Sequence, residues 1–308
     1  MENHKLKYVL ITAARNEEGF IENTIRSVVA QTMKPTKWVI VSDGSMDRTD
    51  EIVKGYAARH EWIELVRMAG EREYQFAAKV QCIQAGWEKL RGGEFDVIGN
   101  LDADITFEAD YMAFLLGKLE GDPRLGVVGT RFVENSRQVY DYKFMNEEHV
   151  SGGFQVFRRG CFEEIGGYLP MRSGGEDWAA VTTARMKGWR TQSYTERLFL
   201  HHRPMGSNGQ PTWNIQFRQG ERDYLTGGHP LWQVSRSAFQ ISRKPFLIGG
   251  LCLLAGYAWA SIRRVERPVP KDLMQFHRAE QMGRLRKLLL IGSKSDRREF
   301  PRAGTPVR

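Results

Sequence analysis

Two aspartates that lie one residue apart, Asp102 and Asp104, follow directly after the apolar run FDVIGNL. Side chains two residues apart in a strand point to the same side, so this spacing places two carboxylates next to each other. Two like charges can lie this close together where water screens them or where a cation lies between them. Because Mg²⁺ and Mn²⁺ prefer oxygen ligands, the pair predicts either a divalent metal site or a solvated turn.

Four other clusters contain groups that bind ligands or transfer protons. They are Arg15-Asn16-Glu17 after the run KYVLITAA, Asp43-Gly44-Ser45 after the run KWVIVS, the acidic pair Glu176-Asp177 after two glycines, and the adjacent histidines His201 and His202. Each acid also has a structural interpretation, because carboxylates complement the dipole at a helix N-terminus and Asp residues often cap helices. Asp47 fits the capping role best.

The apolar periodicity predicts the elements that position these clusters. From residue 7 to residue 104, strand-like apolar runs alternate with amphipathic stretches, which is typical of a mostly parallel sheet flanked by helices. Ligands bind such sheets at the carboxyl ends of the strands, where the clusters at 15–17, 43–45 and 102–104 fall. Further strands are expected in LGVVGTRFV, GGFQVFRR and RLFLHHR, with helices in CFEEIGGY and EDWAAVTTARMKGW.

The composition excludes several classes of protein. The three cysteines have no CxxC spacing, and the N-terminus lacks a signal-peptide pattern, which favours a reducing, cytoplasmic location. Neither a phosphate-binding P-loop nor GxGxxG follows the first strand. The net charge is +8, and the segment from Arg263 onward has 13 Lys and Arg against five Asp and Glu. A basic tail favours an anionic membrane surface as partner rather than nucleic acid.

Four segments, in this order, resemble glycosyltransferase family 2, which has the GT-A fold: ITAARNEEGFIENTIRSVVAQT, VIVSDGSMDRT, NLDADI and SGGEDW. A DxD motif alone is a weak signal, but the four together are specific. The resemblance implies a Rossmann-like α/β catalytic domain, residues 1–230. It also implies Mn²⁺ or Mg²⁺ and the inverting transfer of a hexose from a nucleotide sugar to a hydroxyl acceptor.

The resemblance also implies a role for individual residues. The expected metal ligands are Asp104, Asp102 and one of His201 and His202. The expected nucleotide-sugar contacts are Ala13, Arg15, Glu17, Asp43, Lys79, Asp102 and Ala103. The acceptor site is expected to contain Trp178 and Gly175, and the catalytic residues are Asp177 and Glu176. Inversion requires the acceptor hydroxyl to lose a proton, and Asp177 is the expected base. Lys79 could equally be a solvated lysine on a helix face, and Arg203 could contact the diphosphate.

Two alternatives and one departure from the family bear on the activity. A catalytically silent scaffold should have lost acids from these motifs, and a nucleotidyltransferase should have a basic Gly-rich loop where this chain has AARNEEG. Processive synthases have Gln-x-x-Arg-Trp after the Glu-Asp pair, whereas this chain has QFRQGERDY. Transfer of a single sugar is therefore expected, with Gly220, Arg222 and Asp223 in a mobile lid.

The last part of the chain, residues 231–308, has a different composition. Residues 246–262 contain no charge and would form a helix of about 26 Å, which is at the short limit for a membrane span. A single crossing would place the basic tail outside, against the positive-inside tendency. We expect a peripheral or re-entrant anchor on the cytoplasmic face of the membrane, with a core helix as the alternative. A lipid-linked or glycan acceptor in cell-envelope or exopolysaccharide synthesis would suit this location.

Overall fold

The computed structural model describes residues 6–68, 76–134, 147–171, 174–203, 212–243 and 246–294. The chain divides into two compact units, Met1–Gly209 and Gln210–Arg308, and each is described by itself. The sequence placed a domain boundary later, at residue 230, and where the catalytic part ends stays a prediction. Lys244 and the basic residues after 294 lie outside the described residues.

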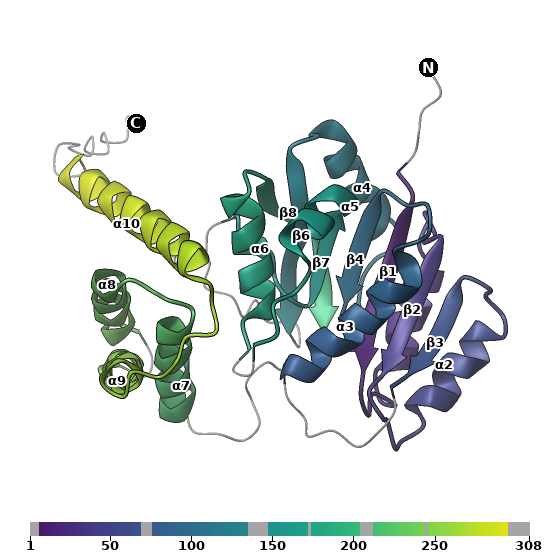
Figure 1. The fold of residues 1–308 in the computed structure, drawn as a ribbon, viewed down its shortest axis with the longest axis horizontal. Helices are drawn as coiled ribbons and strands as arrows, with labels where there is room; N and C mark the ends of the chain where they lie inside the picture. The colour runs from purple at the N-terminus through teal and green to yellow at the C-terminus, as the bar shows by residue number, and fades with distance from the viewer. Residues whose placement is uncertain are drawn as a thin grey trace, which may run out of the picture. The chain divides into compact units, whose positions relative to one another are not determined.

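The first half of the first unit is a run of strands joined by helices (Figure 1). The elements are β1 (Tyr8–Ala14), α1 (Ile21–Val29), β2 (Lys37–Ser42), α2 (Thr49–Ala57), β3 (Ile63–Arg67), α3 (Phe76–Leu90) and β4 (Val97–Leu101). The four strands are parallel in the order β3-β2-β1-β4. Their carboxyl ends therefore meet at one edge of the sheet.

The second half extends the same sheet with strands in both directions. It contains β5 (Ile105–Thr106), α4 (Tyr111–Gly121), β6 (Leu125–Glu134), β7 (Phe154–Arg158), α5 (Arg159–Ile165), α6 (Glu176–Met186) and β8 (Arg190–His201). The order of the described strands is β3-β2-β1-β4-β7-β6-β8-β5, and β7 is antiparallel to both of its neighbours. The predicted fold, a mostly parallel sheet flanked by helices, is confirmed.

The core lies in two layers because successive strand residues point to opposite faces of the sheet. In β1, Tyr8 and Leu10 pack with residues of α1, α2 and α4, whereas Val9 and Ile11 pack with residues of α3, α5 and α6. All four side chains are buried. Both faces of the strand are thus covered, which explains why its sequence is a continuous apolar run rather than an alternating one.

The second unit is built from helices. They are α7 (Thr212–Leu225), α8 (Pro230–Ile241), α9 (Ile248–Ile262) and α10 (Lys271–Lys294). A Cβ at Gly220 of α7 would collide with the carbonyl oxygen of Leu253, and a Cβ at Gly256 of α9 would collide with the carbonyl oxygen of Phe217. Glycine at both positions therefore lets the two helix backbones approach closely.

Two expectations for this unit can be compared with the structure. Gly220, Arg222 and Asp223 lie inside the regular helix α7, packed on α9, so the described structure does not support the predicted lid. The apolar run at 246–262 does form a helix, α9. Among the described residues, no helix has both the length and the apolarity required to cross a bilayer.

Candidate functional site

Asp102, Asp104 and His201 form one cluster, because β5 pairs with the end of β8 and places Ile105 opposite His201. One ligand atom from each of the three side chains lies within 4.8 Å of the others. His201 Nε2 is 3.6 Å from Asp104 Oδ1, and both side chains are nearly buried. Nδ1 of His201 is buried without a hydrogen-bond partner among the described residues. Two carboxylates and an imidazole are a donor set that suits Mn²⁺.

The two adjacent histidines point in different directions, as expected for neighbours in a strand. His202 Nε2 is 2.9 Å from the Thr106 hydroxyl, and its ring stacks on Phe20 with centroids 6.2 Å apart. The sequence left open which histidine belongs with the aspartates. The structure brings His201, and not His202, into that cluster.

Lys79 of α3 lies beside the first aspartate of the DxD motif. Its Nζ is 2.5 Å from Asp102 Oδ1. The contact of Lys79 with the nucleotide stays a prediction. Burial by itself would lower the pKa of Lys79, but the carboxylates of Asp102, Glu176 and Asp177 outweigh it and raise the pKa above its ordinary value. Burial raises the pKa of Asp102, and Lys79 opposes that shift. Lys79 is thus a positive charge shared by the DxD and the Glu-Asp motifs.

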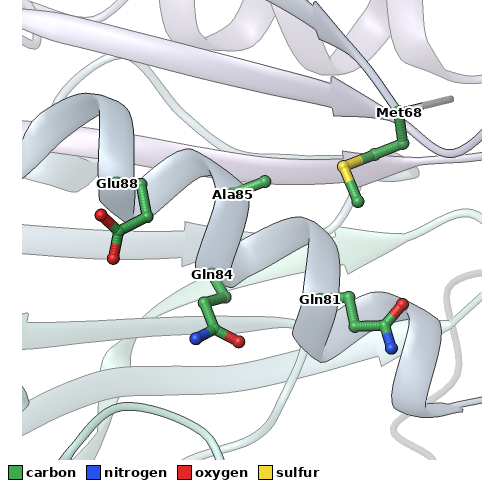
Figure 2. Close-up of a pocket in the computed structure, with 5 residues that line it drawn as sticks. All are labelled: Met68, Gln81, Gln84, Ala85 and Glu88. Atoms are coloured by element: carbon green, nitrogen blue, oxygen red, sulfur yellow. The ribbon is translucent and has the colours of Figure 1, made fainter.

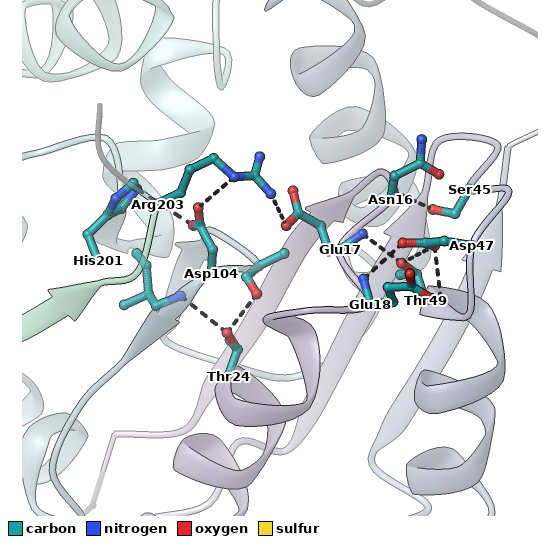
Figure 3. Close-up of polar contacts among 12 residues, drawn as sticks. Asn16, Glu17, Glu18, Thr24, Ser45, Asp47, Thr49, Asp104, His201 and Arg203 are labelled. Carbon is teal, nitrogen blue, oxygen red and sulfur yellow. Dashed lines mark hydrogen bonds and ion pairs between the residues drawn. The ribbon is translucent and has the colours of Figure 1, made fainter. Parts of the chain in front are cut away.

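Glu17, at the end of the first strand, faces the same cluster through Arg203 (Figure 3). Arg203 Nη2 donates to Glu17 Oε2 at 2.5 Å, and its Nε lies 3.9 Å from Asp104 Oδ2. Burial raises the pKa of Glu17 to about 7, although Arg203 opposes the shift. The guanidinium therefore links the acid after β1 to the second aspartate of the DxD motif.

The loops after β1 and β2 hold each other in place (Figure 3). The backbone N–H groups of Asn16, Glu17 and Glu18 donate to the side chains of Ser45, Thr49 and Asp47, respectively. Asp47 also accepts from the backbone N–H of Thr49, the first residue of α2, although the N-cap position of that helix is Arg48, one residue later than predicted.

Asp43 lies buried at the end of β2, and its carboxylate has a cation beside it. Arg15 Nη1 donates to Asp43 Oδ2 at 3.2 Å. Both residues were predicted to contact the nucleotide, and the structure places them side by side at the carboxyl ends of neighbouring strands. Ala13 is half-buried near the end of β1.

Helix α6 places the Glu-Asp pair in its first turn. Gly175 precedes the helix at φ 101°, a conformation that glycine adopts without a steric cost. The carboxylate of Asp177 lies against Gly152, where an added Cβ would be 2.5 Å from Asp177 Oδ2. Glu176 is buried, and its Oε2 has no hydrogen-bond partner in the described part of the chain. Burial, and then the Asp177 charge, raise the pKa of Glu176.

Two consecutive glycines connect the DxD and the Glu-Asp motifs. The Gly153 carbonyl accepts from the Asp102 backbone N–H at 2.9 Å, while the preceding Gly152 touches Asp177. Next to them, Gln155 of β7 donates to the carbonyls of Val150 and Asp177. The segment before β7 thereby fixes the first metal-ligand candidate and the predicted base relative to each other.

Thr24 of α1 holds the middle of the DxD motif. Its hydroxyl donates to the Ala103 carbonyl at 2.7 Å and accepts from the Ile105 N–H at 3.2 Å (Figure 3). Sequence reasoning missed Thr24, Gly152, Gly153 and Gln155. The Gly-Gly pair at the start of the predicted strand GGFQVFRR was a usable signal, since glycine in a strand pattern often marks a close approach of the backbone. Trp178, the predicted acceptor-site wall, is half-buried beside Asp177.

A pocket of about 630 Å³ lies elsewhere in the first unit (Figure 2). Its walls come from Met68 after β3 and from one face of α3: Gln81, Gln84, Ala85 and Glu88. None of these is a residue singled out for chemistry. The candidate site is the cluster at the carboxyl ends of β1, β2 and β4.

Curated proteins and solved structures similar to this chain include glycosyltransferases. In curated sequences, the chain is 23% identical over 260 residues to a probable glycosyltransferase, YdaM, from Bacillus subtilis, covering 77% of this chain and 59% of that protein. It is 23% identical over 200 residues to poly-beta-1,6-N-acetyl-D-glucosamine synthase from Staphylococcus aureus, covering 58% of this chain and 46% of the synthase. The chain thus spans about half the length of the curated relatives it matches.

Solved structures show the same fold. A Pyrobaculum calidifontis mannosyltransferase, solved with GDP-Man and Mn²⁺, superimposes with a TM-score of 0.56 at 19% identity, covering 95% of this chain and 81% of that one. S. aureus TarS, solved with UDP-GlcNAc, gives a TM-score of 0.54 at 14% identity, covering 82% and 72%. The sequence profile of glycosyl transferase family 2 matches residues 9–172. The chain therefore belongs to glycosyl transferase family 2.

Proposed function

We propose that this chain transfers a single sugar, of the hexose type, from a nucleotide-sugar donor to a hydroxyl acceptor with inversion at the anomeric carbon, and that the reaction depends on Mn²⁺ or Mg²⁺. One observation carries the proposal: Asp102, Asp104 and His201 place their ligand atoms within 4.8 Å of one another at the carboxyl end of β4. The Glu-Asp pair of α6 lies on the other side of Gly152 and Gly153.

The residues that are present fit a divalent metal ion. Asp102, Asp104 and His201 would hold the ion. The His201 ring is nearly buried, and its Nδ1 makes no hydrogen bond in the described structure, so the ring is not held by structural hydrogen bonds on both nitrogens. When bound, a divalent cation neutralises charge on a leaving diphosphate. Lys79 and Arg203 add fixed positive charge around the same aspartates.

Asp177 serves as the base in this proposal. Its carboxylate accepts the proton from the acceptor hydroxyl while that oxygen attacks the anomeric carbon. The bond from the anomeric carbon to the diphosphate oxygen breaks at the same time, and the nucleoside diphosphate leaves. The position of Asp177 at the start of α6 is set by the contact with Gly152 and by the Gln155 hydrogen bond to its carbonyl.

Asp43 and Arg15 are proposed to bind the nucleoside part of the donor. A buried carboxylate at the end of β2 accepts hydrogen bonds from ribose hydroxyls or from base N–H groups. Glu17 is proposed to lie on the same side of the donor, and Arg203, which donates to Glu17, is proposed to contact the diphosphate. Trp178 and Gly175, at the start of α6, are proposed to line the acceptor side.

The names of the relatives suggest which donors to test first. GDP-Man and UDP-GlcNAc are the donors in the two superimposed structures, and one curated relative is a polysaccharide synthase. Synthesis of a cell-envelope or extracellular glycan is the process we propose on that basis. The alternative of a nucleotidyltransferase is set aside, because the chain belongs to the glycosyl transferases.

The experiment is a donor panel assayed with purified full-length protein and Mn²⁺. Release of nucleoside diphosphate is measured for GDP- and UDP-sugars, alone and with sugar or lipid-linked acceptors. Turnover of one donor by the wild type, lost in Asp177→Asn and after chelation of the metal, supports the proposal. If no donor is turned over and the protein binds no nucleoside diphosphate in the presence of Mn²⁺, the silent scaffold is favoured instead.

A further inference from the structure

Helix α9 in the second unit has two apolar faces, and only one of them is packed. Gly249, Gly250, Leu253, Gly256, Tyr257 and Ala260 are buried, and contacts of Gly250 and Gly256 show that this face packs against α8 and α7. The opposite face, which we call the outer face, consists of Ile248, Leu251, Ala255, Trp259 and Ile262. Spacings of three and four residues place these five on one side of the helix.

The outer face is exposed in the second unit as the structure describes it. Leu251, Trp259 and Ile262 are 58%, 46% and 80% exposed, which is unusual for large apolar side chains on one stripe. A helix on the surface of a water-soluble domain normally has charged residues on this side. Residues 246–262 contain no charged residue, so no arginine or lysine stem covers the stripe from within the helix.

Basic residues stand at both ends of the helix. Residues 241–265 contain Arg243, Lys244, Arg263 and Arg264 and no Asp or Glu. The Arg263 guanidinium lies 4.3 Å above the ring of Trp259, and Arg243 lies 4.3 Å above Phe239. An apolar stripe bounded by aromatic rings and arginines has the pattern of a helix that lies in a membrane interface, with rings at the headgroup level and cations at the phosphates.

We propose that the outer face of α9 docks on an anionic lipid surface, with the helix axis in the plane of the membrane. The helix is about 22 Å long and would lie along the interface rather than cross it. On α8, the exposed Leu231 and Val234 add apolar surface to the same unit. This proposal does not depend on the reaction proposed above.

The charges favour lipid over a second copy of the chain. In a twofold pair of outer faces, Arg263 and Arg264 of each copy would lie within the same interface, and the acid nearest to them in the sequence is the single Glu266. Anionic headgroups supply negative charge around an apolar layer. Each basic residue near such a surface strengthens the attraction in a salt-dependent way.

The test is cosedimentation of the full-length protein with vesicles. One set contains phosphatidylcholine alone, and the other is an equimolar mixture of phosphatidylcholine and phosphatidylglycerol. Leu251→Asp and Ile262→Asp change exposed side chains on the outer face. Leu198→Asp changes an exposed leucine of β8 in the first unit and is the matched control. Arg263→Gln with Arg264→Gln tests the charges separately.

We expect the wild type and Leu198→Asp to bind the anionic vesicles. Each outer-face variant should bind at least about tenfold more weakly, because docking would bury a charge where the wild type buries an apolar side chain. The arginine variant should bind anionic vesicles more weakly than the wild type, and its remaining binding should depend less on salt. A wild type that stays in solution with both vesicles would overturn the proposal. So would outer-face variants that bind as the wild type does, or that only convert a dimer into a monomer.

Discussion

Replacing Gly152 with alanine should slow sugar transfer without removing any functional group. The added Cβ would lie 2.5 Å from Asp177 Oδ2, 2.8 Å from its Cβ and 2.9 Å from its Cγ, whereas ordinary contacts begin near 3.4 Å. Gly152 does not have a positive φ, so alanine brings no backbone strain of its own. The collision can be relieved only by moving the Asp177 side chain or the segment before β7.

The structure sets the size of the effect. The carboxylate oxygen must move by about 0.9 Å to reach ordinary contact, and a misplacement of about 1 Å can cost about 10²-fold in rate. That factor corresponds to about 2.7 kcal/mol in the activation free energy. Because Gly152 contacts the base and not the nucleoside side of the site, the affinity for nucleoside diphosphate with Mn²⁺ should stay within about twofold of wild type.

The assay is steady-state transfer with the donor identified by the panel, together with calorimetric binding of the nucleoside diphosphate. Gly160→Ala, in α5, is the matched control, because a Cβ there would meet no atom within 4 Å. Its kcat should equal that of the wild type. If Gly152→Ala folds, binds nucleotide and turns over at the wild-type rate, then Asp177 in this position is not the base.

Three further predictions concern the base, the metal and the second unit. Asp177→Asn keeps the shape of the side chain but removes its basicity, so kcat should fall by at least about 10²-fold while donor binding is unchanged, as single-turnover and calorimetric measurements would show. His201→Ala should weaken Mn²⁺ binding about tenfold or more, whereas His202→Ala should leave it nearly unchanged, because only His201 lies with the aspartates; manganese titration followed by electron paramagnetic resonance compares them. Gly220→Ala should destabilise the second unit by about 1–3 kcal/mol because its Cβ collides with the backbone of α9, while Gly283→Ala, in open space on α10, should stabilise it by about 0.5–1 kcal/mol in thermal unfolding.

The parts of the fold that follow from local pattern could be predicted. Strands such as β1 are buried on both faces and so appear as apolar runs, and the clusters after β1, β2 and β4 meet because parallel strands end at one edge. The resemblance of four motifs to glycosyltransferase family 2 then implied the roles of the individual site residues. The antiparallel insertion of β7 between β4 and β6 depends on long-range pairing that no local pattern encodes.

The choice between His201 and His202 shows why the rest of the site could not be predicted. Side chains alternate along β8, but its register against β6 shifts between Thr130 and Arg131, where the partners jump from Tyr194 to Leu198. A bulge of this kind resets which face each later residue occupies. The contact between Gly152 and Asp177 and the ion pair between Arg203 and Glu17 likewise join segments that only the folded chain brings together.

We expect Asp104 and its neighbours to bind a divalent cation together with a nucleoside diphosphate. Calorimetric titration of the wild type and of Asp104→Asn with UDP and GDP, each with Mn²⁺ and with a chelator, tests it directly. Mn²⁺ should strengthen binding of at least one nucleotide to the wild type, and Asp104→Asn should lose this gain while keeping its thermal stability. Nucleotide binding that is equally strong with and without Mn²⁺, or a metal gain that persists in Asp104→Asn, would contradict it.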